Sequence, residues 1–418
     1  MTARSVGHHR GMPTPRTYDV VLYGATSFVG ALTADHLARH APPQTRVALA
    51  GRSRDKLEAL RAGLPGRGRD WPLVVADSSD DAALAAMAAS TTALATTVGP
   101  YAKYGMGVVE ACAAAGTHYA DLTGEVQFAR AAIDRTDATA RASGARIVHS
   151  CGYDSVPSDL GVLLLHQRVA ADGAGELTDV TMTASVRGGL SGGTIDSLRG
   201  EIDTARADRA KAKLARSPHS LSPDAASEPD VEQPSDSPMP TQVDGRWVGP
   251  FVMASYNTRI VRRSNGLTGW SYGKDLRYGE VMATGRGPLG AVAAGVMTAG
   301  LGALVAALSN GVTRPLLDRV LPAPGSGPGP KARAAGWFRS EFVASTTSGA
   351  TYHATVKGSG DPGYAATAVM LGESVLCLAL AGDELPVRAG SLTPATAMGL
   401  PLVERLRAQG HTYEVRQG

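Results

Sequence analysis

The sequence predicts an α/β fold, in which a Rossmann-type doubly wound parallel sheet carries an inserted α+β domain and C-terminal helices return to the first domain. Three observations lead to this fold class. Short apolar stretches alternate with helical ones over about the first 150 residues, as in a parallel sheet. The first apolar stretch runs into a glycine-containing turn and a helix. Strand-like alternation resumes at 177–186 and 342–356, beyond the parallel pattern.

The turn after the first predicted strand, Val20–Tyr23, has the order that a dinucleotide fingerprint requires, with a helix following from Phe28. Gly24 permits a tight turn, and Gly30 lets the helix pack closely on the strand. Ser27 stands where the fingerprint has its middle glycine, and we expect its N–H and hydroxyl to reach a phosphate. An ordinary βα turn with two glycines is the plainer interpretation. The residues predicted to bind the pyrophosphate are Gly24, Thr26, Ser27, Phe28, Val29 and Gly30.

The end of the second predicted strand, Val47–Ala50, indicates which dinucleotide binds. An NAD-binding protein places an acidic residue here, on the ribose hydroxyls. This chain has Arg52, Ser53 and Arg54 instead, with Lys56 close behind. Cations and a hydroxyl suit a 2′-phosphate, so the sequence favours NADP(H), held by Arg52 and Ser53. A solvated start of a helix would show the same residues.

Two more strand ends complete the predicted cofactor site. The third strand, 73–76, ends at Asp77 and Ser78, which we expect to border the adenine ring of the dinucleotide. The fourth strand, 93–98, runs into Gly99 and Pro100, which we expect near the nicotinamide ribose. Ligands bind at the carboxyl ends of strands in open α/β sheets, so all these residues share one edge.

Groups able to move a proton follow the fourth and sixth strands. Tyr101 lies on the first of these loops, and Tyr153 and Asp154 lie on the second. We predict that these three are catalytic, because reduction of a carbonyl or enoyl group needs a donor to oxygen and a proton source. A packing role for the tyrosines and a helix-capping role for the aspartate are the structural alternatives.

The composition limits the class of protein. The chain has 418 residues, a formal net charge of +3 and three widely spaced cysteines. We therefore expect no nucleic-acid surface, no disulfide framework, no metal site and a reducing, cytoplasmic location. Residues 1–16 are polar and are predicted to be a flexible tail without a signal peptide.

The domain boundaries follow from these patterns. We assign 17–160 and 364–418 to the Rossmann domain, and 161–363 to a substrate domain. Within the second unit, 254–262 resembles a strand and 217–242, rich in Ser, Pro and Asp, is predicted to be a disordered loop. The run Gly189-Leu-Ser191-Gly-Gly193 formally matches a nucleophile elbow, but a flexible loop facing the substrate fits better.

Residues 287–313 contain no charged side chain and are rich in Ala and Gly. Their length would permit a membrane span, although four glycines within 290–302 weaken an isolated helix. A pair of buried helices is the interpretation we favour. A lipid-facing element at a membrane surface is the second, and it would make the protein peripheral at the membrane.

Several ordered motifs together resemble the saccharopine dehydrogenase-like oxidoreductases, and within them the branch that includes the mycobacterial trans-acting enoyl reductases of phthiocerol lipid synthesis. The resemblance spans most of the chain and implies an NADP-using Rossmann domain with an inserted substrate domain. The motifs are Gly24-Ala-Thr-Ser-Phe-Val-Gly30, Ala50-Gly-Arg52, Val98-Gly-Pro-Tyr101, Tyr119-Ala-Asp-Leu-Thr-Gly-Glu125, Cys151-Gly-Tyr-Asp-Ser-Val-Pro-Ser-Asp159 and Leu392-Thr-Pro-Ala-Thr-Ala-Met-Gly399.

From the resemblance and the apolar segment we expect NADPH-dependent reduction of an activated C=C bond in an acyl or polyketide-derived lipid. Two alternatives stay open. One is C–N chemistry of the saccharopine type, and the other is a non-catalytic NADP(H)-binding sensor. The expected partner is a small-molecule or acyl-lipid substrate, and both membrane contact through 287–313 and a homodimer are compatible with the sequence. C–N chemistry would require arginines for substrate carboxylates, from the set Arg187, Arg199, Arg259, Arg262 and Arg263.

Overall fold

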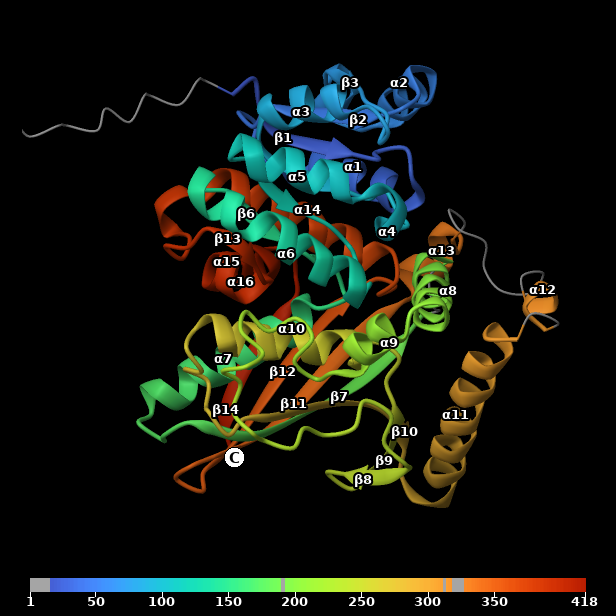
Figure 1. Cartoon of the computed structure of the whole chain (residues 1–418), viewed down its shortest axis with the longest axis vertical. Coiled ribbons are helices and arrows are strands. Elements are labelled where there is room, and N and C mark those ends of the chain that lie inside the picture. Colours follow the sequence, from blue (N-terminus) through green and yellow to red (C-terminus); the bar gives the residue numbers. More distant parts are fainter. Residues whose placement is uncertain (1–15, 189–191, 311–312, 318–326) are drawn as a thin grey trace, which may run out of the picture.

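The computed structural model describes residues 16–188, 192–310, 313–317 and 327–418. Two seven-stranded sheets lie one above the other in Figure 1. The predicted tail up to residue 15 and the centre of the elbow-like run, 189–191, lie outside the described residues.

The first sheet is entirely parallel, in the order β13-β6-β5-β4-β1-β2-β3, so the doubly wound prediction is confirmed. Its central strands are buried because each apolar run is covered by helices on both faces. The strands are β1 (Tyr18–Tyr23), β2 (Val47–Gly51), β3 (Leu73–Val75), β4 (Thr91–Thr96), β5 (His118–Ala120), β6 (Arg146–Val148) and β13 (Gly390–Leu392).

The helices of this domain come from both ends of the chain. The N-terminal ones are α1 (Phe28–His40), α2 (Arg54–Gly63), α3 (Asp81–Ala89), α4 (Tyr101–Tyr104), α5 (Met106–Ala115) and α6 (Val126–Ser143), with a 3-10 turn at Gly66–Asp70. The C-terminal ones are α14 (Ala365–Leu380), α15 (Pro394–Ala397) and α16 (Gly399–Ala408), with a 3-10 turn at Gly382–Glu384. Helix α14 packs on α1, as the predicted return to the first domain requires.

One buried carboxylate holds the returning helices in place. One carboxylate oxygen of Glu373, on α14, is hydrogen-bonded to His36 of α1 at 2.8 Å. The other accepts a hydrogen bond from Arg405 of α16 at 2.9 Å. Because both oxygens have partners, the buried carboxylate is stabilised without water.

The second sheet has the order β14-β12-β11-β7-β10-β9-β8 and is antiparallel except where β10 runs parallel to β7. Helices α7 and α10 cover it on the side of the first domain (Figure 1). The strands are β7 (Leu177–Arg187), β8 (Thr241–Val243), β9 (Arg246–Pro250), β10 (Arg277–Gly285), β11 (Trp337–Thr346), β12 (Thr351–Ser359) and β14 (Thr412–Gln417). The helices are α7 (Val156–Ala171), α8 (Gly192–Ala207), α9 (Arg209–Arg216), α10 (Ala254–Leu267), α11 (Gly287–Leu308), α12 (Arg314–Leu317) and α13 (Pro330–Ala334).

Two predictions about this region are wrong. The stretch 254–262 belongs to helix α10, because its alternation arises from polar side chains that are themselves buried. The segment 217–242 is irregular but not disordered, since it supplies partners to those side chains. Asp236 pairs with Arg259 at 2.8 Å, and the side-chain amide oxygen of Gln233 accepts a hydrogen bond from Arg262 at 3.0 Å.

Strand β14 also departs from the predicted division, which placed all of 364–418 in the Rossmann domain. It pairs with β12 in the second sheet, where Tyr413 is buried. Pairing with β14 covers an edge of β12 that would otherwise leave backbone groups without partners.

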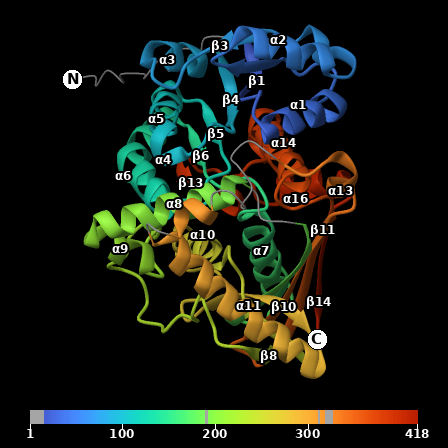
Figure 2. The same cartoon turned by 90° about the vertical axis from the view of Figure 1, so that its right-hand side faces the viewer.

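The apolar segment forms the single helix α11 rather than the favoured pair of buried helices. It lies along the outside of the second domain, in the foreground of Figure 2. Its most apolar window has a mean hydropathy of 2.0 and only 11% of its residues are buried. Within the described residues it is the one helix long and apolar enough to cross a membrane.

Candidate functional site

The turn between β1 and α1 has the tight geometry that the fingerprint predicts. Gly24 has φ +78°, and a Cβ there would lie 2.8 Å from a methyl carbon of Val98. A Cβ on Gly30 would lie 2.3 Å from the Gly24 carbonyl oxygen. Both positions therefore require glycine.

Ser27 plays a different role from the predicted one. Its N–H donates to the Gly24 carbonyl at 2.9 Å, and its hydroxyl accepts from Gly30 N–H at 2.9 Å and pairs with Thr97 at 2.8 Å. Ser27 is thus the N-cap of α1, and its polar groups are used within the turn. The first N–H groups of the helix, those of Phe28 and Val29, have no intrahelical acceptor and remain for a phosphate.

The adenosine end of the predicted site lies at the ends of β2 and β3. Arg52 is exposed, and Ser53 caps α2 by accepting from Lys56 N–H at 3.4 Å. Exposed Asp77 accepts from the Ser79 hydroxyl at 2.7 Å. Hydrogen bonds from Ser79 lower the pKa of Asp77, and the nearby Arg52 charge lowers it further. Half-buried Ser78 follows Asp77.

The loop after β4 is held by Glu125, the last residue of one of the family motifs. The Gly99–Pro100 peptide bond is cis. The next two N–H groups donate to the two Glu125 oxygens, Tyr101 at 3.1 Å and Ala102 at 2.9 Å. Ser197 of α8 also donates to Glu125, at 3.2 Å, so this carboxylate links the two domains. Burial raises its pKa.

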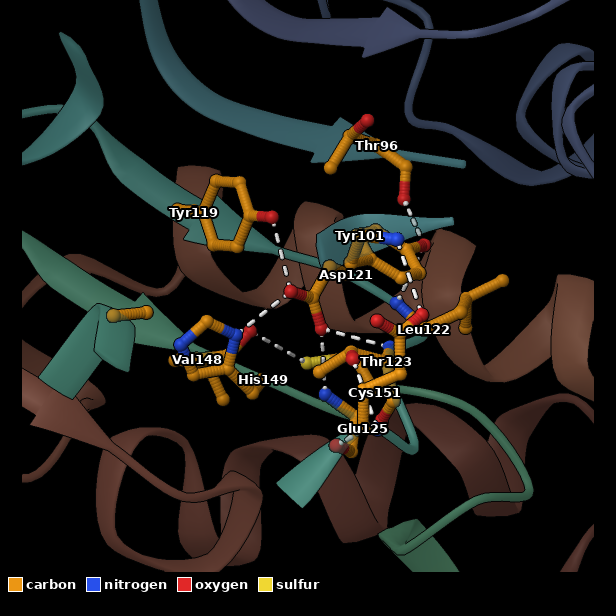
Figure 3. A network of polar contacts seen from close by, with 12 residues as sticks. Thr96, Tyr101, Tyr119, Asp121, Leu122, Thr123, Glu125, Val148, His149 and Cys151 are labelled. Carbon is orange, nitrogen blue, oxygen red and sulfur yellow. Dashed lines mark hydrogen bonds and ion pairs between the residues drawn. The ribbon is translucent and has the colours of Figure 1, made fainter. Parts of the chain in front are cut away.

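Tyr101 is buried, and its hydroxyl is used by the backbone. The hydroxyl donates to the Thr96 carbonyl and accepts from Leu122 N–H, each at 3.1 Å (Figure 3). Burial raises its pKa well above the usual range, so it stays protonated. The geometry therefore gives Tyr101 the role of fixing the loop, and we do not retain it as a catalytic candidate.

Figure 3 shows a network centred on Asp121, which sequence reasoning missed. Its carboxylate is fully buried and lies 2.9 Å from the Tyr119 hydroxyl and 2.7 Å from His149 Nδ1. It also accepts from the N–H groups of Thr123 at 3.1 Å and Ser150 at 2.9 Å. The sequence signal that could have identified Asp121 was its position at the end of β5, next to other site motifs.

The loop after β6 begins at Ser150, which has φ +63°. Tyr153 N–H donates to Thr367 of α14 at 3.0 Å, and the Tyr153 ring lies 5.1 Å from that of Phe338. Its hydroxyl is buried and has no hydrogen-bond partner among the described residues. Burial raises the pKa of this hydroxyl, so it is a protonated donor that lacks an acceptor.

Asp154 is half-buried on the same loop. Burial raises the pKa of its carboxyl to about 7, and the Asp121 charge acts in the same direction. Its own backbone N–H partly opposes the shift. The structure thus brings together two of the predicted catalytic residues, Tyr153 and Asp154, at the edge of the sheet that carries the cofactor turn.

The arginines considered for substrate carboxylates do not form an open cluster. Arg259 donates hydrogen bonds to Asp236 and to the Ala215 carbonyl. Arg263 donates to the carbonyls of Leu221 and Ser391. Arg262 donates to Gln233 and to the carbonyls of Pro218 and Tyr278. Arg187 and Arg199 lie on β7 and α8. These contacts stabilise the fold and argue against C–N chemistry.

A cavity of about 850 Å³ lies between α10 and the segment 215–237. Its walls include Arg259, Arg262, Glu228 and Asp236. None of the residues predicted to bind cofactor or to act in catalysis lines it, so it is separate from the fingerprint.

Comparison with known proteins agrees with this geometry. The sequence model of the saccharopine dehydrogenase NADP binding domain matches residues 20–148. A trans-acting enoyl reductase of Mycobacterium ulcerans is 44% identical over 409 residues, covering 94% of this chain and 97% of that protein. One of Mycobacterium tuberculosis is 43% identical over 409 residues, with 95% and 97% covered.

Solved structures share the fold at low sequence identity. Saccharopine dehydrogenase (L-Glu forming) of Saccharomyces cerevisiae has a TM-score of 0.53 at 14% identity, covering 96% of this chain and 99% of that one. Homospermidine synthase of Legionella pneumophila, solved with NAD, has a TM-score of 0.50 at 10% identity, with 96% and 91% covered. The first domain is therefore an NADP-binding domain, and the chain belongs to the trans-acting enoyl reductase family of saccharopine dehydrogenase-like oxidoreductases.

Proposed function

We propose that this oxidoreductase reduces an activated C=C bond in an acyl chain or polyketide-derived lipid, at the expense of NADPH. The observation that carries the proposal is the identity of 43–44% to trans-acting enoyl reductases over nearly the whole chain, substrate domain included. The site supports the proposal, because Tyr153 offers a hydrogen-bond donor for the carbonyl oxygen of an enoyl compound and Asp154 offers a proton source.

NADPH, when bound along Phe28, Val29 and Arg52, supplies a hydride to the β-carbon. The protein then has two tasks. The Tyr153 hydroxyl, which has no partner of its own, donates a hydrogen bond to the substrate carbonyl oxygen and stabilises the enolate. Asp154, protonated near neutral pH, delivers a proton to the α-carbon.

The surroundings of Asp154 suit a proton donor. Asp121 at the end of β5 faces it, with Tyr101 of α4, Tyr256 of α10, and Cys151 and Tyr153 of its own loop. The Asp154 charge raises the pKa of each of these four neutral groups. None of these neighbours is a cation that would stabilise the carboxylate form, so the carboxyl keeps its proton up to about pH 7.

We also infer that α11 lies on an anionic membrane surface, where such a substrate would be found. Its outward face exposes 84% of Leu289, 64% of Val292 and 68% of Val296. Arg286 precedes the apolar helix, and a cation at the end of such a helix suits anionic headgroups. A second copy of the chain is the competing occupant of this face.

The first prediction concerns the reaction. Purified protein is expected to consume NADPH with long-chain enoyl thioesters or esters, and to use NADH poorly. Absorbance of the reduced cofactor measures both. Consumption with amine and carbonyl pairs instead would establish C–N chemistry, and binding of NADPH without consumption on any substrate would favour the sensor.

The second prediction concerns cofactor choice. Arg52→Ala is expected to raise the KM for NADPH by about 10- to 100-fold, because one charge-assisted hydrogen bond to the 2′-phosphate is lost. The KM for NADH should not change. Arg39→Ala is the control, since Arg39 is an exposed cation in the last turn of α1, where it pairs with Asp35 at 2.8 Å. Equal effects of the two variants on NADPH would refute the role of Arg52.

The third prediction concerns the proton donor. The rate of the wild-type protein should fall as the pH rises through about 7, because the carboxyl of Asp154 then loses its proton. Asp154→Asn should lower kcat by about 10²- to 10⁴-fold and remove this limb of the pH profile. Tyr153→Phe should lower kcat but keep the limb. A limb that persists in Asp154→Asn would assign the proton to another group.

The fourth prediction concerns α11. The protein should sediment with vesicles of phosphatidylglycerol and phosphatidylcholine, and the triple variant Leu289→Glu, Val292→Glu, Val296→Glu should stay in solution. Val387→Glu is the control, because Val387 is 99% exposed outside α11. If the wild-type protein does not bind vesicles but is a dimer, and the triple variant is a monomer, the exposed face of α11 binds a second copy of the chain instead.

A further inference from the structure

Phe28, the first residue of α1, is covered by three groups from the second half of the chain. The Tyr364 ring meets it edge-on, with 5.0 Å between ring centroids. The Arg333 guanidinium lies 5.2 Å from the centre of the Phe28 ring. At Gly327 a Cβ would lie 2.4 Å from a ring carbon of Phe28. The segment 327–334 therefore rests against the start of the fingerprint helix.

This segment is attached to the second domain. Asp361 N–H donates to the Arg333 carbonyl and Gly360 N–H donates to the Gly336 carbonyl, each at 2.9 Å. These bonds join the end of α13 to the chain that leaves β12. Figures 1 and 2 both show α13 where the two domains meet.

Arg333 carries a positive charge next to the Phe28 ring. Its half-buried side chain donates one hydrogen bond, to the Pro328 carbonyl at 2.6 Å. No carboxylate of the described residues pairs with it, unlike Arg259 or Arg405. It lies against the side chain of the first residue of α1, and the N-terminus of that helix is itself positive, so an anion held between the two would be stabilised by both.

We propose that Arg333 binds the pyrophosphate of NADPH, opposite the N–H groups of Phe28 and Val29. The inference rests on the proposed placement of NADPH along the fingerprint. A guanidinium matches phosphate oxygens in a bidentate manner, and the Phe28 face holds it ready through a cation–π contact. The second domain thereby contributes to the cofactor site. Arg52 binds the 2′-phosphate, which only NADPH has, and Arg333 binds the pyrophosphate, which NADPH and NADH share.

Calorimetric titration of the full-length protein with NADPH, NADH and adenosine 2′-monophosphate tests this without any substrate. Arg333→Ala should weaken binding of both dinucleotides by about 10- to 100-fold and leave the monophosphate unchanged. Arg52→Ala should show the converse pattern, with weaker NADPH and monophosphate but unchanged NADH. Arg333→Lys should recover part of the affinity, because it restores the charge without the fork.

Lys331→Ala is the matched control, because Lys331 is an exposed cation on the same short helix. A thermal melt of the apo protein shows whether each variant is folded. Unchanged dinucleotide affinity in a folded Arg333→Ala would overturn the proposal, as would an equal loss from Lys331→Ala. Weaker binding of the monophosphate would assign Arg333 to the 2′-phosphate and also overturn it. Because the readout is binding, a protein inactive on enoyl substrates would still decide the role of Arg333.

Discussion

The buried carboxylate of Asp121 is the constraint on which the geometry of the site depends. A charged group with no exposed surface is stable only when hydrogen bonds replace its water. Asp121 obtains them from Thr123 in its own loop and from His149 and Ser150 after β6. The loops that follow β5 and β6 are thus fixed by a single acceptor. The position of Tyr153 and Asp154 follows from it.

At this site the supporting groups have a full set of hydrogen-bond partners, whereas the proposed catalytic groups do not. Tyr101, Asp121 and Glu125 look as reactive in the sequence as Tyr153 and Asp154 do. In the structure both Glu125 oxygens accept hydrogen bonds and the Tyr101 hydroxyl both donates and accepts. Only a group that is held in place but left without a full set of partners gains by meeting a substrate. That property depends on tertiary contacts, which the residue type does not reveal.

The structural features that could be predicted from the sequence are those that depend on neighbouring residues in the chain. The strand, turn and helix around Gly24 and Gly30 were predictable because backbone geometry there excludes other residues. The prediction failed where distant segments decide the outcome. Helix α10 buries arginines whose partners lie in 217–242. Neither the helix nor the ordered conformation of its partner segment could therefore be predicted from local sequence. Ser27 was misjudged because Thr97, 70 positions away, completes its cap.

In the proposed role of Arg333 the second domain contributes to the cofactor site. It meets the first domain at two places, through Ser197 on Glu125 and through Arg333 on Phe28. Because Glu125 fixes the loop after β4 and Phe28 starts α1, a movement of the second domain alters the groups around the nicotinamide and the pyrophosphate together. The relatives match nearly the whole chain, the second domain included, well beyond the NADP-binding domain of residues 20–148.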